Sequence, residues 1–344
     1  MRNGSVTLLS LEPWDEVRRR NQHLAAELLR QGLVDRLTFV EPAAFGRGRR
    51  EVIEGITVLR PRLLLPRRVG GLRLGAWRLR RLLRDSDVVW VNDAPLGAHC
   101  IRPGRTVYDV TDDWRAASQP ARLRRRLVRA EDRLTARARV VVCSGVLAQR
   151  WAQRYGVTPV IVRNGTPPQL PGPPVRLPGP GPHVGYVGTL HTDRLDLALV
   201  AALAGAPGIG TVHLVGPSSL TPAEVDQLPG VVRHGAVAAE AVPSWLGAFD
   251  VLLCPHRITE FTLSLDAIKA YEYLASGRPV VATPTSGFQD LGETPGVWVT
   301  GAAEFCAAVA TALRSPGPFH RTVPEWSERA REFAAVLGEL PDPT

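Results

Sequence analysis

Lysine is almost absent from this chain. Of its 42 basic residues, 41 are arginines and only Lys269 is a lysine. A bias on this scale is typical of a GC-rich genome, so the number of arginines does not by itself indicate guanidinium chemistry. The same bias makes the one retained ammonium group a candidate functional residue.

Cysteine is scarce as well, with four in 344 residues. The cysteines lie 43, 111 and 52 residues apart, form no Cys-x-x-Cys pair and have no histidine cluster near them, which argues against a zinc site. They are typical of small, reduced, buried side chains. The four are Cys100, Cys143, Cys254 and Cys306.

Long hydrophobic runs are missing too. No stretch approaches the ~20 apolar residues of a membrane span, and residues 1–10 lack the features of a signal peptide. We therefore expect a cytoplasmic protein, with peripheral contact at the inner membrane face as a further possibility.

The share of hydrophobic residues, 44%, is that of a globular protein, and 344 residues exceed the ~250 to 300 that one core can serve. Two domains are expected.

The charge is divided unevenly along the chain. Residues 1–170 hold 32 arginines against 16 acidic residues, whereas residues 171–344 hold ten basic residues against 17 acidic ones. The net charge of +9 therefore conceals a basic half and an acidic half. We expect the basic half to face an anionic partner.

Residues 166–182, TPPQLPGPPVRLPGPGP, contain eight prolines and three glycines and predict a linker between domains 1–165 and 183–344. In both domains short β-branched runs alternate with longer segments of helical period. This alternation predicts an α/β protein of two tandem Rossmann-like, doubly wound domains that face a cleft. A last amphipathic segment, 325–340, either packs back along the junction or caps the second domain.

The segment 250–286, DVLLCPHRITEFTLSLDAIKAYEYLASGRPVVATPTS, is the richest in candidate chemistry. A strand ends near Pro255, a polar loop follows, and a helix is expected from Leu265 with Ser264 as its N-cap and Gly277 just past its end. The loop and the helix N-terminus would supply backbone N–H groups for an anion such as a diphosphate.

Lys269 and Glu272 are three residues apart and so share one face of that helix. Lys269 could neutralise phosphate, and Glu272 could accept hydrogen bonds from both hydroxyls of a ribose. The alternative is an ordinary surface ion pair.

A second candidate is the turn HVGYVGTLHTDRLD after the linker. Gly185 and Gly188 allow a close backbone approach, and Arg194 could bind phosphate or could simply be a solvated arginine of a first helical turn. His191 is interpreted as a hydrogen-bonding loop residue.

In the basic half, the strand TVYDVT runs into Asp112 and Asp113, one pleat after Asp109. Two adjacent carboxylates at the carboxyl end of a strand could provide a base, or they could be a helix cap and a surface acid. The Asp85-x-Asp87 pair precedes its strand, at the opposite end of the sheet. No metal site is predicted.

Two helical segments, 67–84 and 122–139, surround an apolar stripe with arginines. Their arginines could rest on anionic lipid headgroups, bind a charged acceptor, or be solvated. The stripes consist of Leu72, Ala76, Leu79 and Leu83, and of Leu123, Leu127, Ala130 and Leu134.

With these residues located, the chain resembles a glycosyltransferase of the GT-B fold over nearly its whole length. SLDAIKAYEYLASGRPVVATP is similar to the donor-site block Pro-x-Lys-x-Tyr-Glu-Tyr-Leu-Ala-x-Gly-x-Pro-Val-Val of these enzymes, and VIVRNG to the exit of their first domain. PWDEVRRRNQHLAAELL and YDVTDDW resemble bacterial surface-polysaccharide and teichuronic-acid-type transferases.

This resemblance implies transfer of a sugar from a UDP, GDP or dTDP sugar to a hydroxyl of a glycan, lipid-linked or natural-product acceptor. It implies that Glu272 holds the ribose, that Lys269 and Arg194 hold the diphosphate, and that Asp112 or Asp113 is the base of an inverting reaction. No metal or cofactor is implied besides the sugar nucleotide. The other substrate-binding candidates are Trp14, Asp15, Gly188, Thr189, Arg257, Glu260, Ser264 and Asp266.

The chain departs from the family at two positions. Retaining members carry a glutamate where Ser264 stands, so Glu260 or Asp266 would have to contact the donor sugar, and the stereochemical outcome stays open. The proline before Ile-Lys is Ala267 here. Base recognition is expected from the backbone of residues 234–237.

Two other functions share this fold. A nucleotide-sugar 2-epimerase would need no acceptor, which leaves the arginine-rich half unexplained. A catalytically silent partner protein would lose the site, whereas Lys269 and Glu272 are both present. Nucleic-acid binding is disfavoured because no basic motif is interleaved with aromatic residues.

Overall fold

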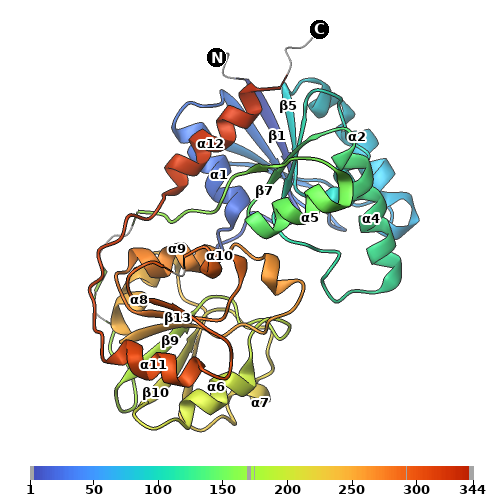
Figure 1. Ribbon diagram of the computed structural model, residues 1–344. Helices are drawn as coiled ribbons and strands as arrows, with labels where there is room; N and C mark the ends of the chain where they lie inside the picture. The colour runs from blue at the N-terminus through green and yellow to red at the C-terminus, as the bar shows by residue number, and fades with distance from the viewer. Residues whose placement is uncertain (1–3, 169–171, 174, 292, 341–344) are drawn as a thin grey trace. The chain divides into compact units, whose positions relative to one another are not determined.

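The computed structural model describes residues 4–168, 172–173, 175–291 and 293–340. They form two compact α/β units, each built on a mainly parallel sheet (Figure 1). The first unit comprises Met1–Asn164 and Trp326–Thr344, and the second comprises Gly165–Glu325. The predicted fold class of two parallel-sheet domains is confirmed.

The first unit contains an eight-stranded sheet in the order β3-β4-β2-β1-β5-β6-β7-β8. All neighbouring strands are parallel except β3 and β4. The strands are β1 (Ser5–Leu9), β2 (Arg36–Val40), β3 (Arg49–Ile53), β4 (Ile56–Arg60), β5 (Val88–Val91), β6 (Thr106–Val110), β7 (Arg139–Val142) and β8 (Val160–Ile161).

Helices cover both faces of this sheet. The inner sides of α2, α4 and α5 pack into one hydrophobic cluster, whereas α1 and α12 lie side by side, as Figure 1 also shows. The helices are α1 (Arg20–Arg30), α2 (Leu72–Arg84), preceded by the π-helical turn η1 (Arg67–Gly71), α3 (Ala94–Gly97), α4 (Ala121–Thr135), α5 (Gly145–Tyr155) and α12 (Trp326–Gly338).

The position of α12 corrects a predicted boundary. The sequence analysis placed the end of the chain in the second domain, but α12 packs on α1 of the first unit. Trp326 stacks on His23 with ring centroids 4.8 Å apart, and Phe333 lies 4.5 Å from Trp90. The apolar stripe was recognised correctly; its partner lies some 300 residues earlier in the sequence and left no local signal.

The first strand of the hairpin β3–β4 was also missed, whereas β4 was expected from its run ITVL. This first strand, RREVI, is charged and largely exposed, so it carries no hydrophobic alternation. The turn has positive φ at both Glu54 (51°) and Gly55 (81°), as a tight two-residue hairpin requires.

The second unit has a six-stranded parallel sheet in the order β11-β10-β9-β12-β13-β14. This is the order of a doubly wound nucleotide-binding fold, whose direction of winding reverses between β9 and β12. The strands are β9 (His183–Val187), β10 (Thr211–Val215), β11 (Val231–Gly235), β12 (Val251–Cys254), β13 (Val280–Ala282) and β14 (Val297–Val299).

The strands of the second unit are connected through short helices and helical turns. These are α6 (Leu197–Ala204), α7 (Pro222–Val225), the turn η2 (Ala239–Ala241), α8 (Val242–Ala248), the turn η3 (Thr262–Ser264), α9 (Ile268–Ala275), α10 (Ser286–Gln289) and α11 (Phe305–Leu313). Phe249, which follows α8, fills the space left by Gly185, because a Cβ there would come within 2.4 Å of its ring. Gly185 therefore serves packing.

The predicted linker 166–182 lies only partly in the structure, since residues 169–171 and 174 are outside the described residues. At its start the backbone N–H of Thr166 donates to the carbonyl of Pro324 (3.0 Å), within the second unit.

Three histidines on neighbouring strands of the second unit form a chain of ring contacts. His183 Nδ1 lies 3.0 Å from His213 Nε2, and His213 Nδ1 lies 2.9 Å from His234 Nε2. Phe249 and Trp245 pack against the rings of His213 and His234. Burial, together with the neighbouring His234 and His183, lowers the pKa of His213 to about 4.

Acidification is expected to destabilise the protein through His213. The unfolded chain takes up this proton near pH 6.5 and the folded chain only near pH 4, so folding free energy is lost as the pH falls between these values. From pH 7 to 5 the loss should be about 2 kcal/mol. Urea unfolding at both pH values should show a smaller loss for His213→Gln than for the wild type or for exposed His320→Gln. Equal losses in all three would contradict this.

Candidate functional site

The reversal point of the second sheet brings two loops together. The chain leaves β9 through residues 188–196 and leaves β12 through residues 255–267. An antiparallel bridge joins Leu195 to His256, and the backbone N–H of Arg257 donates to the carbonyl of Arg194 (2.7 Å). Ligands of open parallel sheets bind at this kind of position, beyond the carboxyl ends of the strands.

Lys269, in the first turn of α9, reaches to the end of β9. Its ammonium group donates to the hydroxyl of Tyr186 and lies 4.2 Å from the centre of the same ring. The Tyr186 hydroxyl in turn donates to the carbonyl of Thr189 (3.0 Å). The only lysine of the chain therefore lies over the turn that follows β9.

Gly188 in this turn is required by the position of Lys269. Its φ is 146°, and a Cβ there would lie 2.9 Å from both Cε and Nζ of Lys269. The close approach expected at Gly188 is thus made by the lysine side chain, which places its ammonium group beside the backbone of the turn.

Arg194 adds a second cation to the site, which also contains the buried His256. The guanidinium of Arg194 lies 5.0 Å from the ring centre of Phe261, and its buried Nε has no hydrogen-bond partner among the described residues. His256 is buried, and burial, followed by the charges of Lys269 and Arg194, keeps its pKa well below the usual value. A neutral His256 beside two cations leaves a net positive site that fits an anion.

Glu272 lies one turn further along α9. Burial raises the pKa of this half-buried carboxyl group, while the charge of Lys269 lowers it. Within the part of the chain that the structure describes, its carboxylate makes no hydrogen bond, and the alternative considered from the sequence, an i,i+3 ion pair with Lys269, is not formed. A desolvated carboxylate without an internal partner is suited to a ligand that brings hydroxyl groups.

The start of α9 differs from the prediction. Its N-cap is Ala267, which has no capping side chain. Ser264 instead ends the turn η3 and is buried, and its hydroxyl donates to the carbonyl of Phe261 (2.7 Å). Leu265 and Ala267 are extended, so the helix begins later than its apolar pattern does.

The other candidates of this segment lie in two environments. Asp266 is buried and accepts a hydrogen bond from the Tyr271 hydroxyl (2.8 Å), so it supports the entry into α9. Arg257 and Glu260 are exposed on the loop after β12.

Sequence reasoning missed the aromatic groups of the site. Tyr186 is almost fully buried against Lys269, and the Tyr273 hydroxyl donates to the carbonyl of Val187 (3.0 Å) and accepts from its N–H (2.8 Å). This pair of bonds fixes the end of β9 against α9. Both tyrosines stand inside the quoted motifs. The partner of each is distant in sequence: Lys269 lies 83 residues from Tyr186, and Val187 lies 86 residues from Tyr273.

In the first unit, the two adjacent aspartates after β6 have different surroundings. Asp113 is buried and its carboxylate pairs with Arg150 (2.9 Å) and Arg154 (3.4 Å) of α5. Asp112 is half-buried and accepts a hydrogen bond from the Thr111 hydroxyl (3.2 Å). Asp113 therefore holds α5, and Asp112 is the more accessible carboxylate.

Asp109 is a structural residue. It is fully buried and pairs with Arg20 of α1 (3.2 Å), while the Trp90 indole N–H donates to it (3.3 Å). Arg20 also donates to the Asn164 side chain (3.1 Å), at the last residue of the unit's first segment. The sequence placed Asp109 near the acidic pair but did not identify this ion pair.

Another buried carboxylate, Glu131 on α4, was not singled out from the sequence. Burial outweighs the opposing effect of its ion pair with Arg115, and the pKa of Glu131 is raised to about 7. Arg115 also reaches Asp132 (2.7 Å) and Tyr155. Because Glu131 is inaccessible to solvent, it stabilises α4 and is not exposed to a ligand.

Trp14 and Asp15, in the loop after β1, are held by the unit itself. Trp14 is buried edge-on against Phe39, with ring centroids 5.0 Å apart, and its backbone N–H donates to the Glu41 carboxylate (2.8 Å). Asp15 is exposed and pairs with Arg19 (2.8 Å). Trp14 therefore anchors this loop.

Among the described residues, no group of three His, Cys, Asp or Glu side chains could hold a metal ion. In the same part of the chain no helix is long and apolar enough to cross a bilayer.

Comparison with known proteins agrees with this geometry. The family described as "Glycosyltransferase Family 4" matches residues 17–170, and that described as "Glycosyl transferases group 1" matches residues 181–315. The Bacillus subtilis (strain 168) protein TuaH, whose name assigns it to teichuronic acid biosynthesis as a glycosyltransferase, is 24% identical over 310 residues, covering 78% of this chain and 77% of TuaH.

Several solved structures share the fold. Sucrose-phosphate synthase from Thermosynechococcus elongatus has a TM-score of 0.71 at 18% identity, covering 97% of this chain and 94% of its own. Anabaena HepE in complex with UDP-glucose has a TM-score of 0.67 at 16% identity, covering 98% of this chain and 100% of its own. An Escherichia coli trehalose-6-phosphate enzyme bound with UDP-2-fluoro glucose has a TM-score of 0.64 at 13% identity, covering 98% of this chain and 96% of its own. With two transferase families matched in order along it, the chain is a glycosyltransferase of the GT-B fold.

Proposed function

We propose that this enzyme transfers a sugar from a nucleoside diphosphate sugar to a hydroxyl group of a glycan or lipid-linked acceptor in the synthesis of a bacterial surface polysaccharide. The donor would bind at the reversal point of the second sheet. The observation that carries the proposal is the combination, on α9, of an ammonium group beside the Gly188 turn with an unpartnered carboxylate one turn away.

The polarity of α9 fits the polarity of a sugar nucleotide. Lys269, Arg194 and the uncapped start of the helix would meet the diphosphate, and Glu272 would accept hydrogen bonds from the ribose. As the bond to the sugar breaks, charge builds up on the departing diphosphate, and the same cations would stabilise it without a metal. The complexes of HepE with UDP-glucose and of the E. coli enzyme with UDP-2-fluoro glucose make UDP sugars the first donors to test.

The acceptor is assigned to the first unit because of its charge and its carboxylates. Asp112 would take the proton of the acceptor hydroxyl as the oxygen attacks the anomeric carbon, which gives inversion. The name of TuaH supports an acceptor that belongs to a surface polymer.

Thermal unfolding with a nucleotide panel tests the donor site. A ligand at a hundredfold excess over its Kd stabilises the folded state by about 2.7 kcal/mol, which should raise the melting temperature of a unit this size by ~5 to 10 °C. UDP, GDP and dTDP should be compared with UMP and uridine, which lack part or all of the diphosphate. At least one diphosphate should stabilise far more than its nucleoside. No shift with any diphosphate would refute the proposed donor site.

A further inference from the structure

Two helices of the first unit, α2 and α4, carry a dense set of exposed arginines. α2 has five arginines and no acidic residue. Among the described residues, no carboxylate pairs with any of these five arginines. The same holds for five of the six arginines on α4. The arginines meant are Arg73, Arg78, Arg80, Arg81 and Arg84 on α2, and Arg122, Arg124, Arg125, Arg129 and Arg133 on α4; all are exposed.

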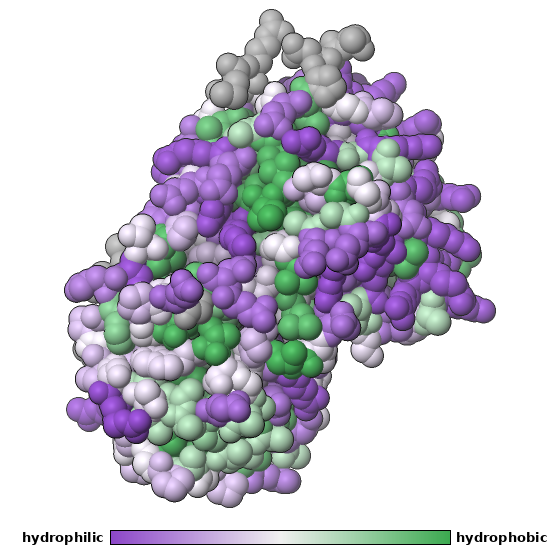
Figure 2. Space-filling view, in the orientation of Figure 1, coloured by the Kyte–Doolittle hydropathy of each residue, from purple (hydrophilic) through white to green (hydrophobic). Residues whose placement is uncertain are grey.

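The two helices form one continuous basic surface. Both pack their inner stripes into the same hydrophobic cluster and both contact α3 between them. His99, just after α3, lies close to both: partial burial lowers its pKa, and the charges of Arg133 on α4 and Arg73 on α2 lower it further. Figure 2 shows the surface over α2 and α4 as strongly hydrophilic, with separate hydrophobic residues between.

Large apolar side chains are exposed on α2, at the start of α4 and in the segment just before α2. Trp77 is 62% exposed and shares a helical face with Arg73, Arg80 and Arg84. Val69, just before α2, is 64% exposed, and Leu64 and Leu65 precede it on the surface. Leu123 of α4 was predicted to pack on the sheet but is 53% exposed, because the first turn of α4 extends beyond the core.

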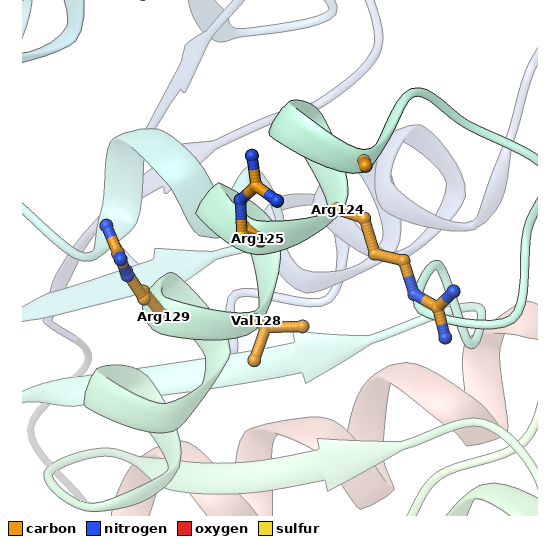
Figure 3. A pocket seen from close by; sticks show the side chains of 5 residues that line it. Arg124, Arg125, Val128 and Arg129 are labelled. Atoms are coloured by element: carbon orange, nitrogen blue, oxygen red, sulfur yellow. The ribbon is translucent and has the colours of Figure 1, made fainter.

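The outer face of α4 is hollowed between its arginines. A shallow depression of about 290 Å³ is lined by Ala121, Arg124, Arg125, Val128 and Arg129. In Figure 3 the three guanidinium groups spread around Val128, which leaves an apolar floor between them. An anionic headgroup could bind several guanidiniums at this place while its chains meet apolar side chains.

We propose that this surface, consisting of Leu64, Leu65, Val69, α2 and α4, docks the enzyme on an anionic lipid bilayer. The exposed arginines gain attraction from anionic headgroups, and Trp77, Leu123 and Val69 enter the boundary between headgroups and acyl chains. A nucleic acid would satisfy the arginines but offers little to the aliphatic side chains. This proposal goes beyond the proposed function and does not depend on it.

Vesicle flotation tests the proposal with the whole protein. The wild type should float with vesicles of equimolar phosphatidylglycerol and phosphatidylcholine, and not with phosphatidylcholine alone. The triple variant Arg124→Glu, Arg125→Glu, Arg129→Glu should bind about a hundredfold more weakly or worse. Trp77→Ala should bind about tenfold more weakly and lose the part of the affinity that resists high salt.

Matched controls separate this surface from general charge and apolarity. Arg314→Glu in the second unit and Val52→Ala on the edge strand β3, both exposed, should float like the wild type. All variants should keep the nucleotide-dependent thermal shift, so loss of the donor site and loss of docking are distinguishable. Equal flotation of the triple variant and the wild type, or binding to a DNA duplex without binding to anionic vesicles, would overturn the proposal.

Discussion

Replacing Glu272 with glutamine is expected to weaken binding of the nucleoside diphosphate about a hundredfold, because two charge-assisted hydrogen bonds to ribose hydroxyls become weaker neutral ones. The protein itself should not be destabilised. The Glu272 carboxylate has no partner among the described residues and burial raises its pKa, so in the free enzyme its charge opposes folding. Calorimetry with the best nucleotide of the panel, together with the melting temperature without ligand, measures both effects.

An analogue shows whether the lost affinity belongs to the ribose. The wild type should discriminate strongly between the nucleoside diphosphate and its 2′,3′-dideoxy form, and Glu272→Gln should bind the two almost equally. Glu304→Gln, an exposed acid on the same unit, is the matched control and should behave as the wild type. If Glu272→Gln still prefers the ribonucleotide as strongly as the wild type does, the carboxylate does not bind the ribose.

The fold could be predicted because its signals are local. Parallel strands buried on both faces read as β-branched runs, and the alternation with helices is visible along the chain, so both sheets followed from pattern alone. The edge strand β3 had no such pattern, since its residues are charged and exposed. The assignment of α12 to the second domain was wrong, because an apolar stripe on a helix does not indicate which surface it packs against.

The site was predicted in part for the same reason. Lys269 and Glu272 share one helix, so their spacing fixed their relation. The contacts of Lys269 with Tyr186 and of Tyr273 with Val187 cross more than 80 residues and depend on the packing of α9 against β9. No local pattern indicates them. The glycines did indicate close approach, but the groups that approach Gly185 and Gly188 are the side chains of Phe249 and Lys269.

The aspartate pair shows how burial separates adjacent residues that the sequence treats alike. Side chains of neighbouring residues point to different sides, so one carboxylate entered the packing against α5 and the other stayed near the surface. The Asp113 carboxylate is already occupied by ion pairs with two guanidiniums, those of Arg150 and Arg154. This difference turns the two candidate bases into residues with opposite expected phenotypes.

Asp112→Asn is expected to lower kcat by 10² to 10⁴, roughly the contribution of a general base, with the melting temperature and nucleotide affinity unchanged. Asp113→Asn should instead cost about 3 kcal/mol of stability, since Arg150 and Arg154 lose their partner, while the folded fraction keeps most of its turnover. Steady-state kinetics with a UDP sugar and an acceptor, measured alongside thermal unfolding of both variants, separates the two roles. If Asp113→Asn abolishes turnover at an unchanged melting temperature while Asp112→Asn stays active, the base is Asp113 and its arginines must release it when the acceptor binds.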